Sequence, residues 1–174
     1  MEEKEVKVQL TKMVFKELLK GMPNNLKPKK FRQKDEYFDT ELMMINNLNR
    51  GLRLRSFNEE PFAIEFKSLF FNKYNKERNP WFIEEISLRL PLDRKSILSF
   101  NTILHRLGLK KIISKNSYDE AELIEELFRI GLSPKISVTK DRRVFEQDGV
   151  EYVFDYIKEL GYFLEIESRC EIDP

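Results

Sequence analysis

Charged and apolar residues alternate over residues 3–10, whose sequence is EKEVKVQL. In a β-strand, side chains at positions i, i+2 and i+4 lie on one face. Glu3, Glu5 and Lys7 are therefore predicted to share one face of a strand, with Val6, Val8 and Leu10 on the other. This stretch predicts a strand with one charged face and one apolar face.

The same alternation returns in later segments. The charged residues with this spacing are Arg53 and Arg55, Glu65 and Lys67, Lys140 and Arg142, and Glu165 and Glu167. Each strand taken alone is read most simply as half-buried, with a solvated charged face. Taken together, they predict a sheet with one charged face. If that sheet closes on itself with the helices outside, the charged face becomes the interior.

The remaining pattern predicts strands separated by helices and turns. Strands are expected over 3–10, 36–40, 51–57, 61–68, 81–90, 134–146, 151–156 and 162–168. Helices are expected over 12–20, from Asp93 or Ser96 to Leu107, and over 119–130. Segments 23–30 and 70–80 are expected to be connections, and Gln147-Asp148-Gly149 a hairpin turn. The pattern predicts an α+β fold with a single domain over residues 1–174.

Length and composition exclude several classes of protein. The 174 residues carry 31 Lys and Arg against 30 Asp and Glu, which argues against a nucleic-acid protein that acts through its overall charge. No apolar run approaches the roughly 18 residues of a membrane-spanning helix, and the N-terminal segment does not resemble a signal peptide. One cysteine excludes an intrachain disulfide. We expect a cytoplasmic protein without a nucleic-acid or membrane partner.

The charged faces predict a binding chemistry. Lysine and arginine side chains hold phosphate oxygens, and arginine does so with two parallel hydrogen bonds. The candidates are Lys7, Arg53, Arg55, Lys67, Lys140 and Arg142. Carboxylates are hard oxygen ligands suited to Mg²⁺ or Mn²⁺. The candidates are Glu3, Glu5, Glu165 and Glu167, with Asp155 as a further member.

At these residues the sequence resembles the CYTH family, also called the triphosphate tunnel metalloenzymes. The family's N-terminal E-x-E-x-K is present as residues 3–7. Six further matches follow in the family's order: YFDT at 37–40, LRLR at 52–55, FK at 66–67, VTKDR at 138–142, FD at 154–155, and LG at 160–161 running into FLEIE at 163–167. The ordered matches extend over nearly the whole chain.

The resemblance implies a closed, eight-stranded antiparallel β-barrel that holds a triphosphate, with helices packed outside. The basic candidates would bind its phosphates, and the carboxylates would hold one or two Mg²⁺ or Mn²⁺ ions. The strand over 81–90 would supply another inward acid, for which we favour Glu85 over Glu84. Family members are often dimers, so a homodimer is expected.

The first hypothesis is a metal-dependent triphosphatase that hydrolyses inorganic tripolyphosphate or a nucleoside triphosphate. Glu5, Glu167 and Lys7 are its candidate catalytic residues. The alternative is a class IV adenylyl cyclase, which converts ATP to cyclic AMP and pyrophosphate. A third hypothesis is a polyphosphate-binding module without activity.

Overall fold

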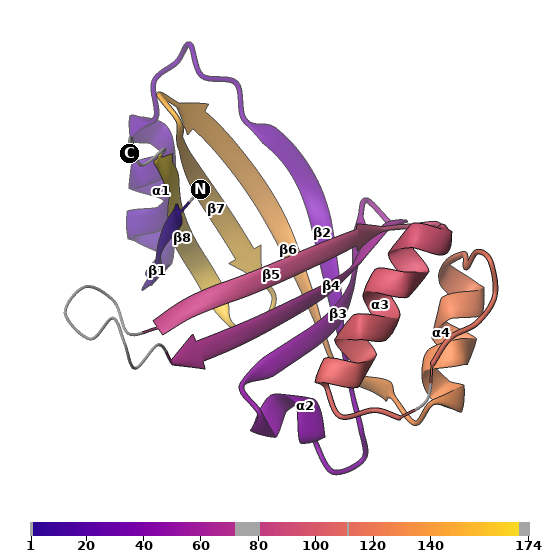
Figure 1. Ribbon diagram of the computed structural model, residues 1–174. Helices are drawn as coiled ribbons and strands as arrows, with labels where there is room; N and C mark the ends of the chain where they lie inside the picture. Colours follow the sequence, from indigo (N-terminus) through magenta and orange to yellow (C-terminus); the bar gives the residue numbers. More distant parts are fainter. Residues whose placement is uncertain (1, 72–80, 111, 171–174) are drawn as a thin grey trace. The chain divides into compact units, whose positions relative to one another are not determined.

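The computed structural model describes residues 2–71, 81–110 and 112–170 (Figure 1). Its elements follow in the order β1 (Glu2–Leu10), α1 (Lys12–Gly21), β2 (Lys29–Asp39), α2 (Met44–Asn47), β3 (Arg50–Phe57), β4 (Glu60–Phe71), β5 (Trp81–Arg89), α3 (Arg94–Arg106), α4 (Glu120–Arg129), β6 (Ser133–Gln147), β7 (Val150–Ile157) and β8 (Gly161–Cys170). No described helix has the length and apolar character needed to cross a membrane.

The strands form one antiparallel sheet in the order β1-β8-β7-β6-β2-β3-β4-β5. This confirms an antiparallel α+β fold with the expected eight strands. Within the described residues, however, the strands at the two ends of this order, β1 and β5, do not pair, so the sheet is open. The predicted closure is wrong because alternation determines which face a side chain takes, whereas closure also requires hydrogen bonds between the two edge strands.

The chain divides into two compact units. The central unit comprises Asp35–Ser137, and the terminal unit comprises Met1–Lys34 with Val138–Pro174. The single domain over 1–174 stays a prediction.

In the central unit, α3 and α4 pack on the apolar face of the hairpins formed by β3, β4 and β5 (Figure 1). Both helices begin where expected, because the Asp93 carboxylate accepts a hydrogen bond from Ser96 N and Asp119 forms a capping box with Glu122. The buried core includes Leu52, Leu54, Ile64, Phe66, Phe100, Leu104, Leu123 and Leu127. Burial of these side chains turns the charged faces of β3 and β4 away from the helices.

In the terminal unit, α1 covers part of the apolar face of β6, β7 and β8. The helix begins after Thr11, whose hydroxyl accepts a hydrogen bond from Val14 N at 3.3 Å. Phe15 of α1 packs edge-to-face on Phe154 of β7, with ring centroids 5.5 Å apart. Glu5 and Lys7 of β1 and Glu165 and Glu167 of β8 lie on the sheet face opposite this contact.

Two hairpins end in turns of left-handed residues. Asp148 and Gly149 have φ of 52° and 76° between β6 and β7, which confirms the predicted turn. Asn58 and Glu59 have φ of 50° and 72° between β3 and β4. Glutamate carries a Cβ and is strained there, whereas glycine is not.

Two elements differ from the sequence prediction. Strand β2 begins at Lys29, although 23–30 was expected to be a connection and the strand was expected over 36–40. Polar and charged residues occupy both faces of its first half, so no apolar alternation marks it. Helix α2 has four residues, too few for a helical period to show in the sequence. Of the predicted connection over 70–80, the backbone of residues 70 and 71 belongs to β4, and the rest lies outside the described residues.

Candidate functional site

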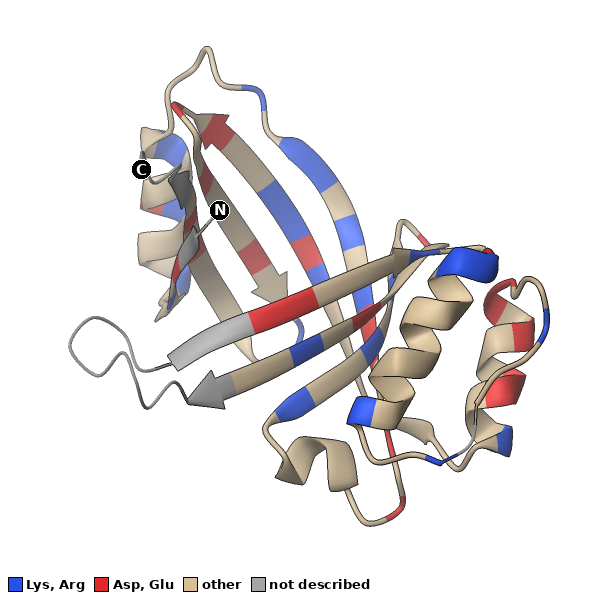
Figure 2. Ribbon diagram, viewed as in Figure 1, with Lys and Arg blue, Asp and Glu red and all other residues tan. Residues whose placement is uncertain are grey.

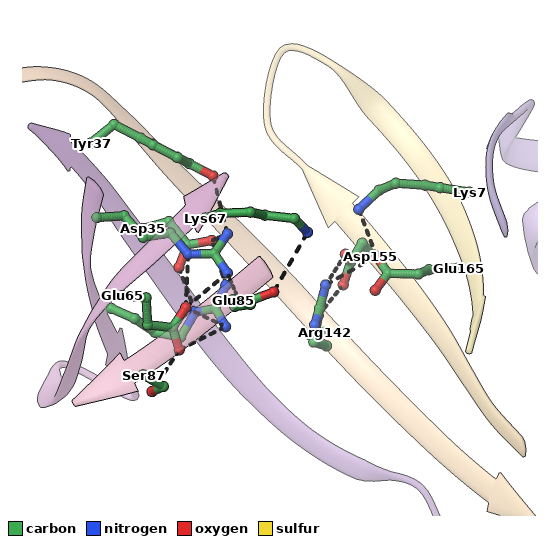
Figure 3. A network of polar contacts seen from close by, with 12 residues as sticks. Lys7, Asp35, Tyr37, Glu65, Lys67, Glu85, Ser87, Arg142, Asp155 and Glu165 are labelled. Carbon is green, nitrogen blue, oxygen red and sulfur yellow. Dashed lines mark hydrogen bonds and ion pairs between the residues drawn. The ribbon is translucent and has the colours of Figure 1, made fainter. Parts of the chain in front are cut away.

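Lysine, arginine, aspartate and glutamate residues recur along the strands of each unit (Figure 2). In the central unit they form a group that we call the central cluster, and in the terminal unit a second group that we call the terminal cluster (Figure 3). The central cluster consists of Asp35, Arg53, Arg55, Glu65, Lys67 and Glu85. The terminal cluster consists of Lys7, Arg142, Asp155 and Glu165.

Arg55 is held by a buried carboxylate. Its Nε donates to Asp35 Oδ1 at 2.7 Å and its Nη2 donates to Asp35 Oδ2 at 3.2 Å. The Asp35 side chain is fully buried. Asp35 lies in β2 and is the first residue of the central unit. Two parallel hydrogen bonds from a guanidinium to a carboxylate fix both groups in one plane. Arg55 therefore has a defined orientation on the sheet before any ligand binds.

Each guanidinium nitrogen of Arg53 donates a hydrogen bond to a different residue. Its Nε donates to Glu65 Oε2 at 2.8 Å, its Nη2 to Glu85 Oε1 at 2.9 Å, and its Nη1 to the Tyr37 hydroxyl at 3.2 Å. Burial alone would lower the pKa of Arg53, but the charges of Asp35 and Glu65 and the hydrogen bond to Tyr37 raise that pKa above its ordinary value. Arg53 is a permanent positive charge on strand β3.

Glu65 joins the two arginines. Besides its bond to Arg53, it accepts a hydrogen bond from Arg55 Nη1 at 3.3 Å and one from the Ser87 hydroxyl at 3.3 Å. Its side chain is buried, and its neighbours Ile64 and Phe66 point into the core on the opposite face. The alternation along β4 therefore places this carboxylate between the arginines of β3.

Lys67 differs from the arginines in its exposure and in the length of its ion pair. Its side chain is 40% exposed, and its Nζ lies 3.6 Å from Glu85 Oε2, which is an ion pair but too long for a hydrogen bond. Three cations and three carboxylates balance the formal charge of the central cluster. A polyphosphate bound to the cluster would add negative charge, so it requires an accompanying cation.

The terminal cluster repeats the pattern with different residues. Arg142 donates two hydrogen bonds to Asp155, at 2.8 and 2.7 Å, and its Nη2 lies 3.6 Å from Glu165 Oε2. Lys7 Nζ donates to Glu165 Oε2 at 2.6 Å. Burial raises the pKa of Glu165, but the hydrogen bond from Lys7 and the charges of Arg142, Lys7 and Lys140 together bring that pKa below its ordinary value. Glu165 is therefore a buried carboxylate that stays ionised.

The acidic candidates differ in how well they suit a metal ion. Asp155 and Glu165 are engaged by Arg142 and Lys7. Glu5 lies directly opposite Glu167 in the β1–β8 pair, and Glu167 lies opposite Glu151 of β7. Like charges in directly opposed positions destabilise a sheet, and a divalent cation relieves that repulsion. Glu5 and Glu167 therefore fit a metal by their chemistry, although the described residues contain no assembled group of three or more metal ligands.

The other predicted residues lie as follows. Glu85 is on the charged face with Arg53, whereas Glu84 points to the opposite face and pairs with Arg106. Lys140 of β6 lies opposite Ile157 of β7. It is two residues from Arg142 and shares a face of β6 with it. The Glu3 side chain lies outside the described residues. The phosphate, metal and catalytic roles of all these residues stay predictions.

Sequence analysis missed Asp35, Tyr37 and Asp39, which are spaced two residues apart along β2. Asp35 fell outside the predicted strand, which began at residue 36. Asp39 was quoted only as part of a family motif and received no role. A strand placed over 29–39 would have put Asp35 and Tyr37 on one face and made them candidates.

The fold and these clusters define an α+β protein whose antiparallel sheet presents cations already held by carboxylates. The CYTH domain matches residues 1–171, so the chain belongs to the CYTH family. No curated protein matched the sequence.

Solved structures show the same fold at low identity. HpAC1 from Hippeastrum, a candidate adenylyl cyclase with a described dominant triphosphatase activity, aligns with a TM-score of 0.60 and 17% identity over 98% of this chain and 80% of that one. A candidate adenylate cyclase from Vibrio parahaemolyticus aligns with a TM-score of 0.56 and 14% identity over 98% of this chain and 78% of that one. A chain of the Schizosaccharomyces pombe Mediator head module aligns with a TM-score of 0.59 and 8% identity over 100% of this chain and 86% of that one. At these identities the likeness concerns the fold alone.

Proposed function

We propose that this protein is a divalent-metal-dependent triphosphatase that releases the terminal phosphate of inorganic tripolyphosphate or a nucleoside triphosphate. The observation that carries the proposal is the pair of arginines on β3, each held by buried carboxylates, with the more exposed Lys67 beside them. Family membership supports the substrate class, because CYTH proteins are triphosphate tunnel enzymes. The described activity of HpAC1 supports hydrolysis over cyclisation.

The cations are the proposed phosphate ligands. Arginine side chains that are already oriented lose little conformational freedom when they accept a phosphate, which favours tight and geometrically defined binding. Lys67 exchanges its long ion pair with Glu85 for a phosphate oxygen. In the terminal unit, Lys7, Lys140 and Arg142 have the same proposed role.

Glu5 and Glu167 are proposed to hold the Mg²⁺ or Mn²⁺. The metal, when bound, neutralises charge that develops on the phosphate oxygens. A carboxylate of this pair is proposed to orient the attacking water toward a terminal phosphorus held by the cations of the same unit, Lys7, Lys140 and Arg142, in line with the bond that breaks. A P–O bond forms as the bridging P–O bond breaks, the shortened polyphosphate leaves, and the proton of the water passes to solvent.

The product distinguishes the hypotheses. The protein is incubated with tripolyphosphate, ATP, GTP and thiamine triphosphate, each with Mg²⁺ or Mn²⁺. From ATP, phosphate and ADP support the triphosphatase, whereas cyclic AMP and pyrophosphate support the adenylyl cyclase. Binding without turnover of any substrate with either metal would leave the polyphosphate-binding module.

A further inference from the structure

The central unit contains a cavity beside the central cluster. Its volume is about 330 Å³, at the low end of the roughly 300–1,000 Å³ typical of pockets for small organic ligands. Two of its lining residues, Arg53 and Lys67, are proposed phosphate ligands. The rest of the lining differs from the cluster in chemistry: Tyr37, Asn46, Asn49, Arg50, Gly51 and Leu69.

The cavity exists because β3 has a glycine at one position of its charged face. Gly51 lies directly opposite Lys67 and two residues before Arg53, so it shares their face. A Cβ built on Gly51 would lie 3.8 Å from Tyr37 Cε1, which is an ordinary contact. Larger side chains at this position would extend into the cavity, where the ring of Tyr37 is held by its hydrogen bond from Arg53.

The wall formed by α2 is fixed by a buried carboxylate. Asp39 is buried and accepts hydrogen bonds from Thr40 N at 2.7 Å, Ile45 N at 2.9 Å and Asn46 N at 2.9 Å. These bonds satisfy backbone donors at the start of α2, and the Thr40 hydroxyl accepts a further one from Met44 N at 3.1 Å. The position of Asn46 at the cavity is therefore set by the fold and does not depend on a ligand.

The lining suits a neutral, planar, polar group better than another phosphate. Asn46 and Asn49 supply amides that both donate and accept hydrogen bonds, and Tyr37 supplies an aromatic face. The Arg50 side chain is held at the edge of the cavity, because its Nη1 donates to the carbonyl of Arg106 at 2.6 Å. A nucleobase has the required ring face and mixed donors and acceptors.

We propose that this cavity binds the nucleoside part of a nucleoside triphosphate whose phosphates lie on Arg53 and Lys67. This inference rests on the proposed triphosphatase function and narrows its substrate class from any triphosphate to nucleoside triphosphates. Inorganic tripolyphosphate would use the cations and leave the cavity unused.

The test fills the cavity without replacing any of the cations. In Gly51→Val, the added side chain occupies the space beside Tyr37, and valine suits a strand. Binding of tripolyphosphate and of an ATP analogue with a methylene group between its β- and γ-phosphorus atoms is measured by calorimetry with Mg²⁺. We expect the variant to bind the analogue about tenfold more weakly, equivalent to roughly 1.4 kcal/mol, and tripolyphosphate with unchanged affinity.

Two further variants make the result decisive. Gly21→Val is the matched control, because Gly21 has open space around it, lies at the end of α1 and does not line the cavity. Asn46→Ala removes an exposed amide at the cavity and gives a second result if Gly51→Val does not fold. The inference is supported if either cavity variant has a lower affinity for the ATP analogue and an unchanged affinity for tripolyphosphate.

The two proposals fail in different ways. The nucleoside pocket is wrong if the folded cavity variants bind both ligands with wild-type affinity. It is also wrong if both affinities fall equally. In either case the proposed triphosphatase function is unaffected. If the wild type hydrolyses neither tripolyphosphate nor any nucleoside triphosphate, the proposed function is wrong, and the binding data still decide whether the cavity takes a nucleoside.

Discussion

Asp35 is fully buried and accepts two hydrogen bonds from Arg55, at 2.7 and 3.2 Å. A buried carboxylate without a partner is costly, so the two residues depend on each other. The pair lies on adjacent strands, β2 and β3, and joins the central cluster to the core of its unit. The cluster thus has a structural role as well as a proposed binding role.

Asp35→Asn is expected to destabilise the protein by about 3 kcal/mol, because breaking a buried ion pair leaves an uncompensated charge. The free energy of unfolding is measured by urea denaturation. Glu60→Gln, at an exposed position near the β3–β4 turn, is the matched control and should be neutral. Equal stability of the two variants would contradict a buried, essential pair.

Lys67→Gln is expected to raise the KM for tripolyphosphate by roughly tenfold or more, because a hydrogen bond to a charged group contributes about 1.5–3 kcal/mol. The turnover number should change less, since the water-orienting carboxylates remain. Steady-state phosphate release measures both constants. Lys16→Gln on the exposed side of α1 serves as the control, and an unchanged KM in Lys67→Gln would remove this lysine from the binding site.

Glu5→Gln is expected to lower turnover by roughly 100-fold and to raise the Mg²⁺ concentration needed for half-maximal activity, because a carboxylate ligand and water-orienting group is lost. The change adds no bulk to an exposed position on β1. Activity is titrated against Mg²⁺ for this variant and for Glu17→Gln on α1. Wild-type metal dependence in Glu5→Gln would rule out a metal role for Glu5.

Glu165 is expected to remain ionised below its ordinary pKa of 4.5, because Lys7 and Arg142 stabilise the carboxylate. A depressed folded pKa stabilises the protein fully above the unfolded pKa, and this contribution is lost as the pH falls through the folded value. Carbon NMR of the labelled carboxyl group follows the titration. Lys7→Met should move the pKa of Glu165 upward, and an unmoved titration would contradict the assigned ion pair.

Glu59→Gly is expected to stabilise the protein by about 1 kcal/mol, because the left-handed backbone at this turn strains a residue with a Cβ. The reverse change in the other hairpin, Gly149→Ala, should destabilise by a similar amount. Urea denaturation compares both with the wild type. A loss of stability in Glu59→Gly would show that the glutamate side chain has a stabilising contact that outweighs the strain.

The charged faces could be predicted because alternation is a local property of the chain. Arg53 and Arg55 were expected on one face, and the structure places them there with Glu65 between them. Glu85 lies on that face and Glu84 on the other. This agrees with the choice of Glu85 over Glu84 as the acid on the charged face.

Other features depend on contacts between segments that the sequence does not pair. Asp35 becomes a partner of Arg55 only when β2 lies beside β3, and its own segment lacks the apolar alternation that marks a strand. The open order of the strands could not be read from alternation either, because each strand's pattern is the same whether or not the edges pair. The cavity at Gly51 depends on the absence of a side chain. No alternation or spacing in the sequence predicts such a cavity.

The strict order of leucines and arginines in β3 restricts how this segment can change in length. Deleting one residue between Leu52 and Arg55 would shift the downstream part of the strand by one position and exchange its two faces. Arginine would then point at the helices and leucine would take the place of the arginines in the central cluster. We therefore expect natural length variation among relatives to fall in the turns that flank this strand, while the strand itself keeps its residue count.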